Sequence, residues 1–189
     1  MDHILKKRWL YVVNGFIVLL FMGCSLAWSI FVVPLENTYG WVRTETSIAF
    51  TLNVIFFSVG GIFSGILNKK LSFPAILRIA AVMVGAGFFL SSFADQVWIL
   101  YITYSFLCGV GIGLGYNAVV STVPLWFPEK IGAINGILLT GYALSSAVLG
   151  VAIHAMIENM GIVNAFRVLA VICMAGLFLG SLDVYKRQA

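Results

Sequence analysis

The stretch Gln96–Pro128, QVWILYITYSFLCGVGIGLGYNAVVSTVPLWFP, contains no Asp, Glu, Lys or Arg. Because about 17–25 apolar residues of helix cross a bilayer, this stretch alone is long enough to span a membrane. It also lacks the strict alternation of apolar and polar residues that is typical of a barrel strand. The stretch therefore predicts a transmembrane helix.

The composition of the whole chain supports the same interpretation. The 189 residues are 61% hydrophobic and only 10% charged, whereas a soluble domain has about 25% charged residues. The net charge of +4 comes from short basic clusters between apolar runs. Such clusters orient membrane proteins, so we expect a lipid bilayer as the environment and no nucleic acid as a partner.

Five further intervals without charged residues lie at 9–35, 46–68, 79–94, 131–157 and 168–182. The two shortest reach membrane-spanning length when residues 75–77 and 165–166 are added, with Arg78 and Arg167 extending from the ends toward the interface. We predict an all-α, polytopic membrane protein with a six-helix bundle over residues 1–182. The expected helices are about 9–33, 48–67, 75–93, 97–123, 131–153 and 165–182, and residues 183–189 are interpreted as a truncation or assembly tail.

The basic residues predict how the chain is oriented. With the N-terminus inside, nine Lys and Arg are cytoplasmic and only Arg43 and Arg167 are external. The nine are Lys6, Lys7, Arg8, Lys69, Lys70, Arg78, Lys130, Lys186 and Arg187. The positive-inside rule then predicts cytoplasmic N- and C-termini in a plasma or inner cell membrane.

Glycines and cysteines in the apolar runs predict packing. The pairs Gly109/Gly113 and Gly111/Gly115 are spaced four apart, as are Gly61/Gly65 and Gly132/Gly136. That spacing places small residues on one helix face, where another backbone can approach or slide. The three cysteines lie singly inside apolar runs, so we expect core residues and no metal site or cofactor.

No Asp, Glu, Lys or Arg falls in the middle of a predicted span. Proton relays and ion sites usually need such a group, and no nucleophile–base pair is present, so an intramembrane enzyme is not expected. The mid-membrane polar residues are neutral, and they can bind a small solute or one another across helices. They are Asn14, Ser25, Trp28, Asn53, Ser58, Tyr101, Tyr104, Tyr116, Asn117, Thr140, Tyr142, Ser145 and Ser146.

The connection between the fourth and fifth helices carries the most specific motif. Tyr116–Asn117 is followed by Trp126, Phe127, Pro128 and Lys130, and then by Gly132, Gly136 and Gly141–Tyr142. A second cytoplasmic motif, Gly65 to Lys69, connects the second and third helices. Further pieces are Trp28–Pro34, Gly40–Glu45, Ala49–Leu52 and Asn164–Phe166.

With these motifs, the chain from about Trp9 to Gly180 resembles the oxalate/formate antiporter group of the major facilitator superfamily. More loosely, it resembles the related monocarboxylate carriers. The resemblance implies the N-terminal half of a twelve-helix transporter, whose substrate lies at the midplane between two six-helix halves. It also implies that Tyr116 and Tyr142 line the substrate cavity. We add Trp28, Asn53 and Asn117 as candidate substrate-binding residues.

Two positions depart from the pattern of that group. Lys69 occupies the place of an Asp that helps to lock the inward-closed state, which puts that interaction in doubt. Ser25 and Leu26 replace an amide and an aromatic residue of the oxalate carriers, which favours an acid other than oxalate. The resemblance implies that the basic residues binding a dicarboxylate lie in the second half.

The leading hypothesis is a secondary active transporter fragment that moves a small organic anion by alternating access, with the C-terminal six-helix half as its partner. The alternatives are a major facilitator carrier of another small polar solute, a complete six-helix subunit that pairs with a copy of itself, and a non-transporting membrane receptor or sensor.

Overall fold

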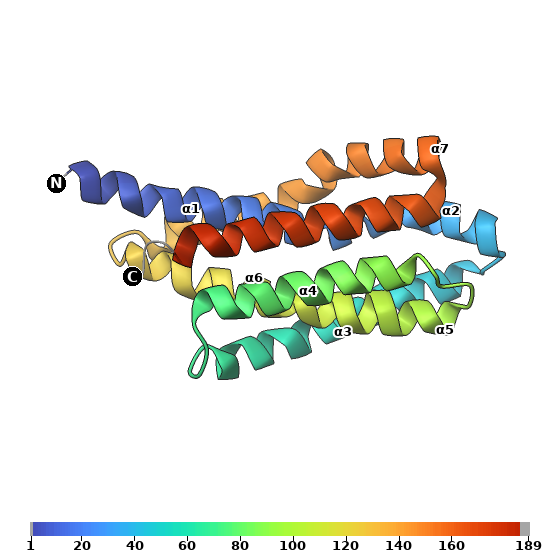
Figure 1. Cartoon of the computed structure of the whole chain (residues 1–189), viewed down its shortest axis with the longest axis horizontal. Helices are drawn as coiled ribbons and strands as arrows, with labels where there is room; N and C mark the ends of the chain where they lie inside the picture. The colour runs from blue at the N-terminus through green and yellow to red at the C-terminus, as the bar shows by residue number, and fades with distance from the viewer. Residues whose placement is uncertain (1, 186–189) are drawn as a thin grey trace.

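Helices form almost the whole of the chain. The computed structural model describes residues 2–185, and side chains are placed for residues 8–182. Within these residues every regular element is helical, and the elements run as antiparallel rods along one axis (Figure 1). The all-α prediction is confirmed. The predicted tail at 183–189 lies outside the described side chains, as do Lys6, Lys7, Lys186 and Arg187.

Two of the spans are composite. The first joins α1 (Asp2–Met22), a 3₁₀ segment (Gly23–Ala27) and α2 (Trp28–Tyr39). The fourth joins α5 (Val97–Leu100), a π-helical segment (Tyr101–Cys108), α6 (Gly109–Thr122) and a 3₁₀ turn (Val123–Trp126). The second and third spans are the continuous helices α3 (Arg43–Leu67) and α4 (Phe73–Ser91).

The last element, α7 (Ile131–Tyr185), turns back on itself at Gly161. By length and hydropathy five elements of the described chain can cross a membrane. The longest of them, Ile131–Leu182, has 52 residues and reverses direction at Gly161 (φ 79°), so it consists of two antiparallel helical limbs (Figure 1). Only glycine adopts such a positive φ at low cost, so the reversal needs that residue.

The helices extend further than the sequence indicated at several places, and α3, for example, begins at Arg43 rather than at about residue 48. Residues 34–39 continue α2 past Pro34, and the expected loop at 154–164 is helical on both sides of Gly161. The expected boundaries stopped before Pro34 and before His154. A helix continues into the interface because its backbone needs hydrogen bonds there, and at Pro34 only the backbone N–H of that residue is missing. Gly40 (φ 72°) ends α2 in the left-handed conformation common after helix C-termini.

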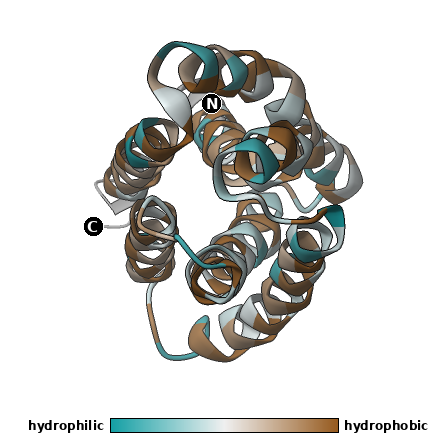
Figure 2. Ribbon diagram, turned by 90° about the vertical axis from the view of Figure 1, so that its right-hand side faces the viewer, coloured by the Kyte–Doolittle hydropathy of each residue, from teal (hydrophilic) through white to brown (hydrophobic). Residues whose placement is uncertain are grey.

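We call the end of the bundle where α1 begins the terminal end, and the other the Gly161 end. Figure 2 shows apolar residues on the outward faces of the helices, with hydrophilic residues gathered mainly at the ends and connections. The most exposed apolar side chains include Val151 (74% exposed), Leu125 (70%) and Ile62 (67%). Surfaces of this kind are stable in hydrocarbon and not in water, so the structure agrees with a multi-pass membrane protein.

The glycine pairs of α6 pack as predicted, on two faces. Gly109 and Gly113 lie against α3, where a Cβ on Gly113 would overlap the carbonyl oxygen of Phe57. Gly111 and Gly115 lie against α4, and Gly115 also contacts Met22 of α1. Two closely approaching neighbours explain why one helix needs four glycines.

The same prediction is wrong for three other glycines within this chain. An added Cβ on Gly65, Gly132 or Gly136 would meet no described atom within 4 Å. Spacing alone shows that small residues share one helix face, but it does not show whether a neighbouring helix of the same chain packs on that face. Gly61, in contrast, packs against the Asn117 side chain of α6.

We expect Gly113→Ala to destabilise the bundle by about 1–3 kcal/mol, because the added methyl group meets backbone that cannot rotate away. Gly136→Ala is the matched control, and it should be neutral or stabilising by up to about 1 kcal/mol through helix propensity. Thermal unfolding of both variants in one detergent measures the difference. Equal melting temperatures for the two variants would contradict the close α3–α6 contact.

Candidate functional site

Aromatic side chains from three spans meet in the middle of the bundle. The rings of Tyr116 (α6) and Tyr142 (α7) lie 5.0 Å apart at 62°. Phe57 of α3 lies 5.2 Å from Tyr116 and 6.4 Å from Tyr142. The structure therefore brings together the two tyrosines that the sequence singled out. It adds Phe57, which no sequence pattern distinguishes from the other apolar residues of its helix.

The 3₁₀ segment of the first span lies beside this group. Gly23 allows close approach to the backbone of Tyr142 and the side chain of Ser145. The Ser25 side chain is a hydrogen-bond neighbour of the Tyr142 hydroxyl. A 3₁₀ stretch inside a long helix often marks a hinge or a functional site. We define the mid-bundle cluster as Ser25, Phe57, Tyr116, Tyr142 and Ser145.

One polar atom of the cluster has no partner. The Ser145 hydroxyl is fully buried, and no described group forms a hydrogen bond with it. An unpaired buried hydroxyl costs about 1–3 kcal/mol of stability. The Ser145 hydroxyl is therefore a candidate for hydrogen bonding to a bound solute. The other two such atoms among the described residues, Ser64 Oγ and Asn135 Oδ1, belong to residues outside the cluster.

Trp28 and Asn53 lie next to Tyr104 rather than in the cluster. Trp28 is 4% exposed, stacks on Tyr104 at 4.2 Å and donates a hydrogen bond from Nε1 to the Thr46 carbonyl at 3.0 Å. Asn53 is 3% exposed and donates from Nδ2 to the Tyr104 carbonyl at 3.0 Å. Both residues hold the π-helical segment of the fourth span against its neighbours.

Asn117 lies one residue beyond Tyr116 but faces α3. Its amide donates to the carbonyl of Gly113 in its own helix at 3.0 Å, and its side chain covers Gly61. Asn117 is half-buried. Of the five candidate substrate-binding residues, only Tyr116 and Tyr142 contact each other directly through their side chains.

The residues of the Trp126–Lys130 motif hold the terminal end together. Trp126 stacks on Tyr11 of α1 at 4.9 Å, and Phe127 meets the ring of Trp9 at 5.6 Å. Arg8 lies over Phe127 at 5.4 Å and pairs with Glu129 at 3.5 Å. The first span is thereby fixed to the connection between α6 and α7, with Pro128 and Lys130 exposed at its turn.

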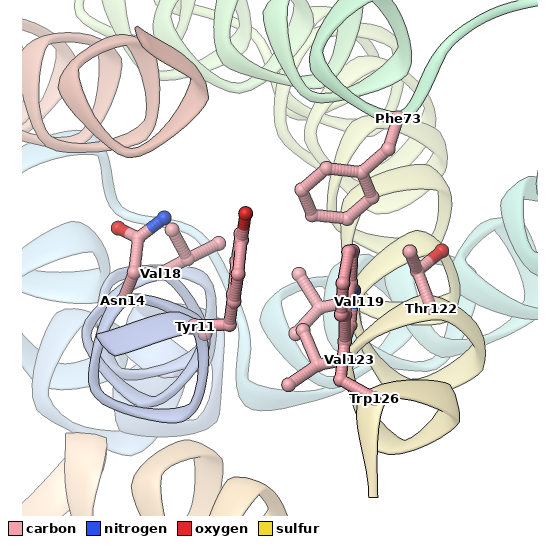
Figure 3. A pocket seen from close by; sticks show the side chains of 9 residues that line it. Tyr11, Asn14, Val18, Phe73, Val119, Thr122, Val123 and Trp126 are labelled. Atoms are coloured by element: carbon pink, nitrogen blue, oxygen red, sulfur yellow. The ribbon is translucent and has the colours of Figure 1, made fainter. Parts of the chain in front are cut away.

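The cavity next to this contact is small. It has about 10 Å³ of free volume and lies between the start of α1, Phe73 of α4 and the end of the fourth span. Figure 3 shows Tyr11 and Asn14 on one side of it and Val123, Trp126 and Phe73 on the other. That volume suits at most one water molecule, so this corner is packed and is not a solute site.

The Gly65–Lys69 motif contacts the fourth span through a residue between its named positions. Asn68 Nδ2 lies 3.2 Å from Ser121 Oγ of α6, while Lys69 and Lys70 are exposed in the turn before α4. Sequence reasoning used Arg8 only for orientation and did not use Tyr11. The repeated aromatic residues at 9, 11, 126 and 127 were the available signal for the contact described above.

A wider groove of about 580 Å³ lies between the first span and α7 toward the Gly161 end. Ile30, Ser146 and Gly150 line it, and His154 and Glu158 lie at its outer part, with His154 Nδ1 3.5 Å from Glu158 Oε2. Within the described residues no group of three or more His, Cys, Asp or Glu could hold a metal ion. The arrangement suits recognition of a solute through hydroxyl groups and aromatic faces.

Comparisons with known proteins give the chain a family context. The family model described as Major Facilitator Superfamily matches residues 14–187. An uncharacterized MFS-type transporter, YhjX, from Escherichia coli K12 is 23% identical over 176 residues, which cover 93% of this chain and 44% of the relative. The MFS-type transporter eupM from a Phoma species is 24% identical over 183 residues, covering 95% of this chain and 64% of the relative.

A shorter match involves the monocarboxylate transporter 9 of Gallus gallus. It is 30% identical over 100 residues, covering 53% of this chain and 20% of the relative. The chain thus spans less than two thirds of the length of the curated relatives that it matches.

We expect Ser145→Ala to leave the melting temperature unchanged or raise it, because it removes an unpaired buried hydroxyl. Asn53→Ala should lower stability by about 0.6–2 kcal/mol, because it breaks a hydrogen bond between two spans. Thermal unfolding of the two purified variants measures this contrast. A clear loss of stability in Ser145→Ala would show that its hydroxyl has a partner in the protein.

Proposed function

Because the chain belongs to the Major Facilitator Superfamily, a family of transporters rather than enzymes, we propose that it forms one half of a secondary active transporter for a small organic anion such as a mono- or dicarboxylate. The match to a protein named as a monocarboxylate transporter supports this substrate class. The other six-helix half of such a carrier is its expected partner, and transport proceeds by alternating access between the halves.

The unpaired Ser145 hydroxyl beside Tyr142 carries the proposal. A buried hydroxyl without a partner is unfavourable in the empty protein, and a solute oxygen that pairs with it restores the lost hydrogen bond. Ser25, Tyr116 and Tyr142 add hydroxyl groups and aromatic walls around the same place. A carboxylate, with two acceptor oxygens, suits a set of neutral hydroxyl donors.

The mid-bundle cluster contains no cation to balance the charge of an anion. Burying an uncompensated carboxylate is costly, so we assign the compensating Lys or Arg to the partner half. A carrier of another small polar solute is the alternative. Without a cation at the site, the neutral cluster suits a neutral solute as well as it suits an anion. The groove between α2 and α7 is the proposed route from the Gly161 end.

The breaks in the first span support motion at the site. The segment Gly23–Ala27 lies beside Tyr142, and Ala27 (ψ 15°) departs from α-helical geometry. At the terminal end, the Arg8–Glu129 pair and the Tyr11–Trp126 stack fix the same span to the α6–α7 connection. We propose that the terminal contact keeps the six helices together as a unit while the half rocks against its partner.

Substitution of the cluster in the complete carrier tests transport. Tyr142→Phe and Ser145→Ala should each raise the KM for the transported acid by roughly two- to thirteen-fold, the effect of losing one hydrogen bond of about 0.5–1.5 kcal/mol. Thr51→Val is the control, because Thr51 is exposed on α3 and bonds only to its own helix in the structure. Uptake of radiolabelled formate, oxalate and lactate into vesicles provides the measurement.

The outcome distinguishes the competing functions. Uptake of none of the acids, with neutral solutes carried instead, would overturn the anion assignment. Uptake of no solute at all by well-folded protein would favour a receptor or sensor. Unchanged KM in both cluster variants, with normal transport, would mean that Tyr142 and Ser145 are packing residues.

We propose a cell membrane with both termini in the cytoplasm. Among the described side chains, Arg8, Lys69, Lys70, Arg78 and Lys130 lie toward the terminal end, while Arg43 and Arg167 lie toward the Gly161 end. The positive-inside rule places the more basic end in the cytoplasm.

Cysteine labelling tests this orientation. The native Cys24, Cys108 and Cys173 are all buried, so they give a low background. In intact cells an impermeant maleimide should label Val42→Cys and leave Lys69→Cys unlabelled until the cells are opened. The reverse pattern would place the terminal end outside and contradict the proposed orientation.

A further inference from the structure

A groove on the outer surface between α4 and the second limb of α7 is not part of the candidate site. Its volume is about 230 Å³, and its lining is entirely apolar: Val82, Gly85, Ala86, Phe89, Ala170, Val171 and Met174. Val171 is 61% exposed and Val82 is 55% exposed, so the groove opens outward. At its floor Gly85 lets α4 approach Met174 of α7 closely, and the small side chains of Ala86 and Ala170 lie beside larger neighbours.

An arginine lies at each end of this helix pair, in reciprocal positions. Arg78 of α4 donates to Ser181 of α7 at 3.4 Å and lies 5.9 Å from the ring of Phe178. Arg167 of α7 donates to Ser92 of α4 at 3.3 Å and lies 5.1 Å from the ring of Phe93. The groove therefore runs between two guanidinium groups, each packed on an aromatic ring.

Arg167 is the more open of the two. Its side chain is exposed, and only its Nε is used in the contact with Ser92. Among the described residues no carboxylate lies within 4 Å of it. A guanidinium carries five N–H donors, so both terminal amino groups are left without a protein acceptor among the described residues.

Arg167 lies on the same face of α7 as the residues of that helix that line the groove. Ala170, Val171 and Met174 follow Arg167 at helical spacings of three, four and seven residues, which places all four side chains on the same face. On α4 the lining from Val82 to Phe89 extends about 10 Å along the helix axis. An apolar furrow with a cation at its end matches an amphiphile that has an anionic head.

We propose that this surface binds one anionic phospholipid, with an acyl chain in the groove and its phosphate on Arg167. In a bilayer an acyl chain gains little hydrophobic energy by leaving other lipids, so shape and the charged contact must hold it. Arg binds phosphate through two parallel N–H bonds, which are stronger than neutral hydrogen bonds. Basic pockets between transmembrane helices bind anionic head groups on the cytoplasmic side of other membrane proteins, and Arg167 offers the same chemistry at the Gly161 end.

Native mass spectrometry of the purified 189-residue chain, titrated with phosphatidylglycerol or phosphatidylcholine, tests the proposal. We expect one tightly retained phosphatidylglycerol and no comparable retention of phosphatidylcholine. Arg167→Gln should lower retention roughly ten-fold by removing the charge-assisted contact. Arg167→Lys should fall between them, since Lys offers a point charge without the paired geometry.

Two further variants separate the acyl-chain contact from the head-group contact. Ala86→Phe fills the groove and should lower retention although Arg167 is intact, and Val171→Phe is a second filling variant in case the first does not fold. The matched controls are Arg43→Gln, whose native side chain pairs with Glu36 at the same end, and Ile62→Phe on the exposed face of α3. Both controls should retain the lipid like the unchanged chain.

Four results would overturn the proposal, and three of them are equal retention of the two lipids, unchanged retention in Arg167→Gln, and equal losses in the control variants. The first and third would mean that only a non-specific lipid shell surrounds the protein. Retention that depends on Arg167 but not on the filling variants would mean a head-group contact without a seated acyl chain, which also contradicts it. Size-exclusion chromatography and circular dichroism of each variant confirm that folded protein is compared.

Discussion

The backbone of this chain must satisfy its own hydrogen bonds, because hydrocarbon offers none, and the rest of the structure follows from that constraint. It favours continuous helices and a neutral interior, and it makes each departure from α-helical geometry costly. The departures that occur are therefore informative. In the first span the Ser25 carbonyl accepts from the backbone N–H of Trp28 and faces the Tyr104 hydroxyl at 3.4 Å. In the fourth span the Tyr104 carbonyl accepts from Asn53 of α3. Each break is stabilised by polar groups of a neighbouring span, and together the two breaks border the mid-bundle cluster.

Close backbone approach is the second determinant, and it acts differently on the two sides of the bundle. On α6 the glycines let α3 and α4 contact the backbone itself, which brings Tyr116 within reach of Phe57 and Tyr142. Between α4 and the second limb of α7, Gly85 meets Met174, and the paired arginines close both ends. The first arrangement positions side chains around the cluster, whereas the second leaves a furrow that opens to the membrane. Small residues thus serve the candidate site on one side and the lipid-facing surface on the other.

Much of the fold could be predicted from the sequence, because charge-free intervals follow directly from the energetic cost of placing charges in hydrocarbon. The reversal at Gly161 was harder to place, since the polar residues around it also favour helix and only the backbone angle distinguishes the turn. The candidate site was predicted in part. Tyr116 and Tyr142 were found through resemblance, but Trp28 and Asn53 could not be separated from them, because residue type does not reveal whether a polar side chain already has a partner. The unpaired state of Ser145 is a property of tertiary packing that no local pattern encodes.

The neutrality of the mid-bundle cluster has a mechanistic consequence when the chain functions as one half of a carrier. Neutral hydroxyl groups recognise the shape and acceptor oxygens of a solute, but they discriminate weakly between an anion and its neutral analogue. Charge discrimination must then come from a cation that meets the solute only when the halves close around it. When shape recognition and charge recognition lie in different halves, the solute binds weakly to the neutral site of the open state. Its affinity becomes high only in the closed state. Differential affinity of this kind can couple a solute to a conformational change, because equal affinity for both states would shift nothing.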